Sequence, residues 1–156
     1  MFIDGYNQFD PASAALTVSR VSTNIIDLSV GRDLGINPDM PIKLAVFVAQ
    51  TFTAAGAATL LIQFMGAPDN GAGAPGAFTV YSESRAYALA DLVQGNRLYV
   101  VDIPGKPAGD PLPRFYQLNY VVTTGPMTAG NLSAAMVLDR PDTLLYPSGF
   151  TLAAVA

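Results

Sequence analysis

Alternation of apolar and polar side chains between Arg114 and Asp139 constrains the fold of this chain more than any other feature. The first half of the stretch places four apolar residues at alternate positions: Tyr116, Leu118, Tyr120 and Val122. The second half repeats the pattern at Leu132, Ala134, Met136 and Leu138. A period of two is typical of half-buried β-strands. Residues 124–130, which lie between the halves, hold two glycines and a proline, which is turn chemistry. The pattern predicts a long antiparallel hairpin with one apolar face against a core.

The rest of the chain consists of short apolar or β-branched segments separated by glycine and proline. We predict strands at 16–20, 23–28, 42–50, 58–65, 78–82, 87–89 and 97–103, and a last strand or an arm at 150–156. Residues 42–50 are apolar on both faces, which indicates a central, buried strand. Residues 66–77 hold four glycines and two prolines and predict a long flexible loop. We expect one all-β domain over 1–156, a jelly-roll or β-sandwich of about eight antiparallel strands with extended terminal arms.

Composition excludes most catalytic chemistry. The chain has no cysteine and no histidine, so thiolate metal sites, His-dependent triads and the His-rich metal cluster of cupins are excluded. Asp102 and Asp110 could form a glycosidase carboxylate pair, but nothing in the sequence indicates that they converge. The motif Gly71-Ala72-Gly73-Ala74-Pro75-Gly76 matches G-x-G-x-x-G, yet a strand rather than a helix follows it. We therefore predict no enzymatic activity, no cofactor and no metal.

Charge and hydropathy limit the kinds of partner that the chain can have. A net charge of −4 with only two lysines disfavours nucleic-acid binding, which needs clustered cations. The most apolar window, 52–67, is interrupted by Gly56 and Gln63 and is too short to span a bilayer, so we expect no membrane insertion. Residues 1–6 do not resemble a signal peptide, so we expect no secretion. An apolar fraction of 51% with 13% charged residues has two readings: alanine richness, or surface that a partner covers.

The two ends of the chain hold most of the candidate contact residues. Residues 1–15 read as an arm or irregular lead-in that docks on its own domain or on a neighbour, through Phe2, Ile3, Tyr6 and Phe9. The tail, 140–156, offers Leu144, Leu145, Tyr146 and Phe150. Arg114 and Arg140 flank the predicted hairpin, and each could form a strand-end ion pair or reach a carboxylate on a partner.

Several segments together carry a family resemblance: Thr23-Asn24-Ile25-Ile26-Asp27-Leu28, Gly31-Arg32-Asp33-Leu34-Gly35, Pro113-Arg114-Phe115-Tyr116-Gln117-Leu118-Asn119-Tyr120 and Ala129-Gly130-Asn131-Leu132-Ser133-Ala134. From about Ala15 to Asp139 the chain resembles the capsid cement (decoration) proteins of tailed bacteriophages, of the Bordetella-phage type. The resemblance implies a jelly-roll without catalytic activity that self-associates, as a homodimer or homotrimer. It also implies synthesis in the host cytoplasm and a place on the outer surface of the capsid, where such proteins bind the major capsid protein and bridge capsomers.

A second function class stays open from the sequence. A carbohydrate-binding or tail-associated jelly-roll of a phage particle would fit the same strand pattern. It requires exposed aromatic side chains that line a groove beside Asp and Asn residues.

Overall fold

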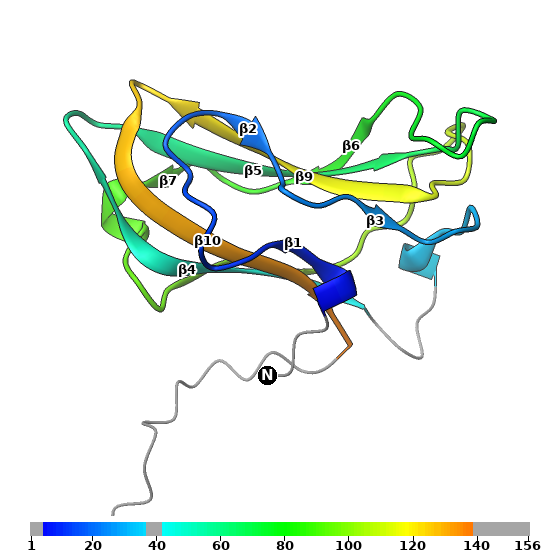
Figure 1. Cartoon of the computed structure of the whole chain (residues 1–156), viewed down its shortest axis with the longest axis horizontal. Helices are drawn as coiled ribbons and strands as arrows, with labels where there is room; N and C mark the ends of the chain where they lie inside the picture. Colours follow the sequence, from blue (N-terminus) through cyan, green and yellow to red (C-terminus); the bar gives the residue numbers. More distant parts are fainter. Residues whose placement is uncertain (1–4, 37–41, 139–156) are drawn as a thin grey trace, which may run out of the picture.

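The chain folds into two antiparallel β-sheets packed face to face, as the computed structural model shows (Figure 1). The structure describes residues 5–36 and 42–138. Within these ranges the strands are β1 (Gln8–Asp10), β2 (Arg20–Val21), β3 (Ile26–Asp27), β4 (Lys43–Ala54), β5 (Thr59–Ala67), β6 (Thr79–Glu83), β7 (Tyr87–Ala88), β8 (Arg97–Asp102), β9 (Phe115–Thr123) and β10 (Met127–Val137). Three short 3₁₀ helices accompany them: η1 (Gly5–Asn7), η2 (Leu34–Ile36) and η3 (Leu89–Asp91). The predicted all-β class is confirmed, and the sandwich is compatible with a jelly-roll.

Four strands form sheet A, in the order β1-β10-β4-β8. β4 lies at its centre, as the two-sided apolar pattern predicts, although the strand runs on to Ala54. The register between β4 and β10 shifts near Gln50 and again near Thr53, so the strand contains bulges. The bulged region lets Phe52 turn into the core over Gly130, whose backbone φ of 137° and lack of a side chain accommodate the ring.

Sheet B follows the path β2-β9-β5-β6, with β3 paired to β9 and β7 paired to β5. β5 and β9 pair over nine residues, from Thr59 opposite Thr123 to Ala67 opposite Phe115. The predicted strand 23–28 is shorter than expected, since only Ile26 and Asp27 are paired in it.

The core lies between the two sheets, and both halves of the alternating sequence pattern face it. Tyr116, Leu118 and Tyr120 of β9 are fully buried, and so is Leu132 of β10. Phe64 of β5 stacks on Tyr116, with ring centroids 5.3 Å apart. The alternation is therefore correct for most of the side chains it assigns to the interior, but Val122 is only partly buried and Leu138 is 67% exposed.

The pairing of β9 with β10 is where the sequence prediction is wrong. The two strands do not form a hairpin, because β9 belongs to sheet B and β10 to sheet A. Thr124 and Gly125, with φ of 65° and 100°, carry the chain across the sandwich instead. The chain crosses in the same way between β4 and β5, at the same end of the molecule (Figure 1). Each strand of the alternating stretch thereby pairs along its length with a strand of its own sheet, β9 with β5 and β10 with β4.

Candidate docking surface

Both ends of the described chain meet at one corner of sheet A. β1 pairs with the last part of β10, with Gln8 opposite Ala135, and Val137 at the end of β10 lies opposite Lys43 of β4. The segments that precede residue 5 and follow residue 138 are therefore attached side by side. We call this corner, formed by η1, the start of β1 and residues 137–138, the terminal corner.

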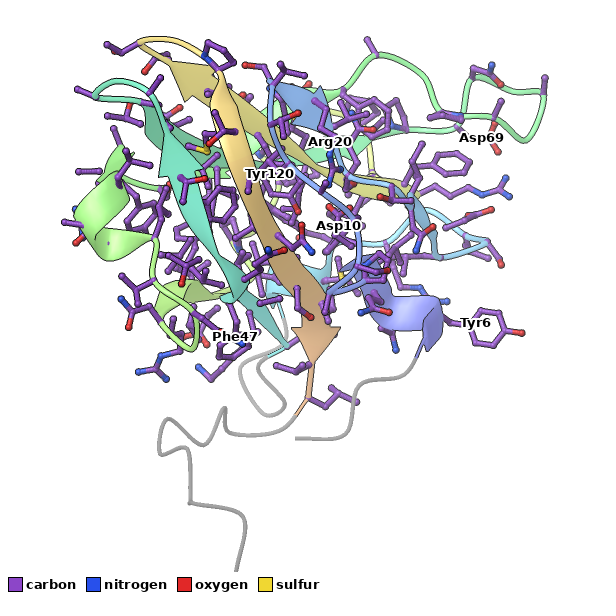
Figure 2. The ribbon with its side chains drawn as sticks, turned by 60° about the vertical axis from the view of Figure 1, so that its left-hand side comes forward. Tyr6, Asp10, Arg20, Phe47, Asp69 and Tyr120 are labelled. Carbon is purple, nitrogen blue, oxygen red and sulfur yellow. The ribbon has the colours of Figure 1, made fainter. Side chains whose placement is uncertain are left out.

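Two large apolar side chains at the terminal corner face solvent. Tyr6 on η1 is 91% exposed and Leu138 is 67% exposed. Figure 2 shows Tyr6 pointing away from the domain. Monomeric proteins expose single apolar residues often, and these two are the most exposed large apolar side chains among the described residues.

The outer face of sheet A carries a second apolar cluster, whose central residues are buried. Ala45 of β4 and Ala135 and Val137 of β10 form a second, smaller hydrophobic cluster. Phe47 of β4 and Val100 of β8 pack against it. The cluster lies on the side of sheet A that faces away from the core, but Ala45, Ala135 and Val137 are at most 5% exposed, so it is not an open surface.

A buried polar cluster fixes the start of the domain. The carboxylate of Asp10 is fully buried and accepts hydrogen bonds at Oδ1 from Arg20 Nη1 (3.0 Å), Thr23 N (3.1 Å) and Thr23 Oγ1 (2.5 Å). Tyr120 Oη donates to Asp10 Oδ2 at 2.6 Å. Burial, together with the Asp10 carboxylate, raises the pKa of the Tyr120 phenol well above its ordinary value. The cluster joins β1 to β2 and β9, and it holds the terminal corner in place (Figure 2).

Sequence reasoning missed this cluster, because an aspartate followed by proline is usually a turn former. A signal was present: Asp10 directly follows Phe9, a core residue, in a segment with no other charge after Asp4.

Arg114 clamps two segments that are far apart in sequence. Its guanidinium binds Asp27 with two bonds, from Nε to Oδ1 (2.7 Å) and from Nη2 to Oδ2 (2.8 Å), and it reaches Asp69 Oδ2 from Nη1 at 2.5 Å. The hydrogen bond from Arg114 lowers the pKa of Asp27, and the two carboxylates raise the pKa of Arg114. Of the two alternatives for Arg114, the structure shows the ion pair at the strand end, made within the chain.

The glycine-rich loop between β5 and β6 is internally hydrogen-bonded. Asp69 Oδ1 accepts from the amides of Gly71 (2.8 Å) and Gly73 (3.0 Å), and Asn70 Oδ1 accepts from Ala72 N (2.8 Å). The bond from the Gly71 amide is the largest cause that lowers the pKa of Asp69, and Arg114 adds to it. The loop is therefore internally bonded and tied to the start of β9 through Arg114, while its flexibility stays a prediction.

The predicted contact residues divide into three groups. Tyr6 is exposed, whereas Phe9 is fully buried, so Phe9 docks on its own domain and offers no surface to a neighbour. Arg114 serves the internal clamp. The remaining candidates lie outside the described residues: Phe2, Ile3, Arg140, Leu144, Leu145, Tyr146 and Phe150. Because β9 and β10 lie in different sheets, the argument that a hairpin brings Arg114 and Arg140 together no longer holds.

The described residues contain no group of three or more His, Cys, Asp or Glu side chains that could hold a metal ion. Asp102 is bound to Lys43, and Asp110 lies in the loop before β9, where its main-chain carbonyl accepts from Lys106. No helix within 5–36 and 42–138 is long and apolar enough to cross a membrane.

The carbohydrate-binding alternative requires exposed aromatic side chains beside polar ones. Sheet B carries a polar ladder, in which Asn119 donates to Gln63 (2.8 Å) and Gln63 to Glu83 (3.3 Å). Among the described side chains, Tyr6 is the only strongly exposed aromatic, and it lies on η1, beside β10 of sheet A. The described surface therefore gives this alternative no support.

The fold defines the class of protein: an all-β, two-layer antiparallel sandwich that is compatible with a jelly-roll. Comparison with protein families then identifies the group: the model of the Bbp16 family matches residues 11–136. The chain belongs to the Bbp16 family, a family of Bordetella phage proteins, and the resemblance seen in the sequence is confirmed. The family indicates a phage structural protein and a component of the virion. Comparison with curated proteins finds no match.

Proposed function

We propose that this protein is a capsid cement protein, which binds the outside of the shell built by the major capsid protein and stabilises the phage head by bridging capsomers. It acts without catalysis, as a self-associated unit. Membership in a phage structural family supports this function, and so does an all-β sandwich compatible with the jelly-roll that the resemblance implies.

The observation that carries the proposal is the terminal corner. Both terminal segments are attached there, beside the exposed side chains of Tyr6 and Leu138. The two segments contain Phe2, Ile3, Leu144, Leu145, Tyr146 and Phe150, which we propose to contact the same partner surface. Each contact is weak by itself, but contacts linked in one unit gain avidity from a raised effective concentration.

Binding to purified shells tests the proposal. We expect the protein to co-sediment with expanded shells and not with precursor shells. A double variant, Tyr6→Ser with Leu138→Ser, should bind at least about tenfold more weakly, because each substitution removes about 1 kcal/mol of apolar contact.

The matched control is Val93→Ser. Val93 is 44% exposed and lies beside the other end of β4, where Gln94 N bonds Thr51 Oγ1. Retention equal to that of the wild type in the double variant would exclude the terminal corner as the contact. A wild-type protein that binds neither kind of shell would exclude the cement function itself.

A further inference from the structure

The loop between β5 and β6 contains the only asparagine of the chain that is followed by glycine, Asn70 before Gly71. An asparagine side chain can react with the backbone amide of the next residue, because attack on Cγ closes a five-membered ring within the chain. A side chain on the next residue hinders this attack, and glycine has none. Nothing lies within 4 Å of the position that a Cβ would take at Gly71. The steric requirements of the reaction are therefore met at this position.

Hydrogen bonds within the loop hold both of the reacting groups. The nucleophile, the Gly71 amide nitrogen, donates to Asp69 Oδ1 at 2.8 Å. The electrophile, the side-chain amide of Asn70, is held at its Oδ1, which accepts from Ala72 N at 2.8 Å and from Ala74 N at 3.4 Å. The main-chain nitrogen of Asn70 also donates to Ala74 O at 3.0 Å. The Gly71 nitrogen is therefore free to attack only when the loop opens.

The charge of Asp69 opposes the first step of the reaction. The Gly71 nitrogen becomes a nucleophile when it loses its proton, and a carboxylate that accepts the N–H bond favours the protonated form. The hydrogen bond from the Gly71 amide, and after it the one from Arg114, lowers the pKa of Asp69, so this carboxylate is ionised at neutral pH. Its second oxygen, Oδ2, accepts from Arg114 Nη1 at 2.5 Å. Arg114 thereby fixes the carboxylate in the projecting loop, where Figure 2 shows Asp69.

We propose that Asn70 is a site of spontaneous deamidation, and that Asp69, positioned by Arg114, keeps this modification slow in the folded protein. The Gly71 nitrogen loses its proton and forms a bond to Asn70 Cγ. The bond between Cγ and Nδ2 breaks, and the side-chain nitrogen takes up one proton and leaves as ammonia. Water then opens the succinimide ring at one of its carbonyl carbons. Opening at Cγ gives aspartate, and opening at the main-chain carbonyl carbon gives isoaspartate.

The modification changes the charge and the backbone of the loop. Both products place a new carboxylate next to Asp69, and isoaspartate also lengthens the main chain by one methylene group. Molecules of this protein therefore come to differ at the loop as they age. The inference goes beyond the proposed function and concerns the chain in solution, so it holds or fails independently of shell binding.

Incubation of the full chain in mildly alkaline buffer tests the site. Peptide mass spectrometry follows the conversion of Asn70 with time, and liquid chromatography separates the aspartate and isoaspartate products. We expect slow conversion in the folded wild type and conversion at least about tenfold faster in wild type unfolded by guanidinium chloride, where the loop bonds are absent. Asn96, which is exposed and is followed by Arg97, is the reference in the same samples and should convert more slowly than Asn70 in the unfolded chain.

Two variants test the roles of the residues around the site. Asp69→Ala removes both the acceptor and the charge beside the Gly71 amide, so we expect conversion about tenfold faster than in the folded wild type. Arg114→Gln leaves the acceptor but removes its guanidinium partner, so we expect conversion about threefold faster. Arg85→Gln, which breaks the exposed ion pair with Asp91, is the matched control and should convert at the wild-type rate. Circular dichroism and thermal unfolding show whether each variant is folded.

Each other outcome contradicts a defined part of the proposal. Absence of conversion at Asn70 in the unfolded wild type would exclude the modification site. Equal rates in the folded and the unfolded wild type would show that the loop gives no protection. Slower conversion in Asp69→Ala would reverse the role of Asp69, because the carboxylate would then be acting as a base that takes the Gly71 proton. A wild-type rate in Arg114→Gln would remove Arg114 from the account.

Discussion

Asp10 shows how one side chain can decide where the folded domain begins. Its carboxylate is fully buried, meets the charge of Arg20, and accepts four hydrogen bonds from three residues. A buried carboxylate is stable only if such partners replace its hydration. The residues before it form an exposed 3₁₀ turn, whereas Phe9 and Asp10 belong to the core. The boundary between arm and domain is therefore near residue 8, and not at residue 15 as the sequence suggested.

Asp10→Asn tests this role at the residue scale. The amide keeps the shape but removes the negative charge, which leaves Arg20 without its counter-charge. We expect a loss of about 3 kcal/mol in the free energy of unfolding, measured by urea denaturation.

The control for this variant is Asp91→Asn, which breaks the exposed ion pair with Arg85. It should change the free energy of unfolding by less than about 0.5 kcal/mol. Equal effects of the two substitutions would show that the buried cluster does not anchor β1.

At the scale of elements, the sequence predicts faces well and pairing poorly. The alternation at Tyr116, Leu118 and Tyr120 correctly assigns these side chains to the core, because period two is a local property of a strand. The pairing of β9 with β10 does not depend on local sequence alone. β9 pairs with β5 over nine residues, and the short turn between β9 and β10 carries the chain to the other sheet. The same limit explains why the Arg114 clamp could not be located from the sequence: Asp69 lies 45 positions before Arg114, and Asp27 lies 87 positions before it.

Arg114 also sets the rigidity of the glycine-rich loop. In Arg114→Gln, Asp69 loses its guanidinium partner while its bonds to the loop amides remain. We expect faster hydrogen exchange at the amides of Gly71 and Gly73, because local opening of the loop becomes easier. Exchange in β5 and β9 should change little.

Arg85→Gln is the matched control, since Arg85 forms an exposed ion pair with Asp91 elsewhere on the surface. It should leave exchange in the loop unchanged. Unchanged protection at Gly71 and Gly73 in Arg114→Gln would mean that the loop holds its shape without the clamp.

For the molecule as a whole, tyrosines placed between the sheets make stability sensitive to alkali. Burial raises the pKa of Tyr81 to about 12, and it raises the pKa values of Tyr87, Tyr116 and Tyr120 as well. A phenol whose pKa is raised in the folded state makes its full contribution to the free energy of unfolding at any pH below its unfolded-state pKa of about 10. The unfolded chain releases protons first above that pH, so the contribution is lost as pH rises further.

We therefore expect the free energy of unfolding to be level from pH 7 to about pH 9.5 and to fall steeply above about pH 10. Urea denaturation at a series of pH values measures this decline, and Tyr81→Phe should make it shallower. A free energy of unfolding that stays level to about pH 11.5 would contradict the burial of these phenols.

Neighbouring ends have a consequence for the topology of the chain. Strands paired in a sheet lie about 4.8 Å apart, so the start of β1 and the end of β10 are within reach of a short peptide linker. The described domain could be circularly permuted: a linker would join its present ends, and new ends would open in the loop at Gly71–Gly73, which bends away from both sheets. The permuted chain would keep every strand pair of the sandwich, and its new ends would lie in the glycine-rich loop. A protein fused to those ends would therefore be displayed at that loop.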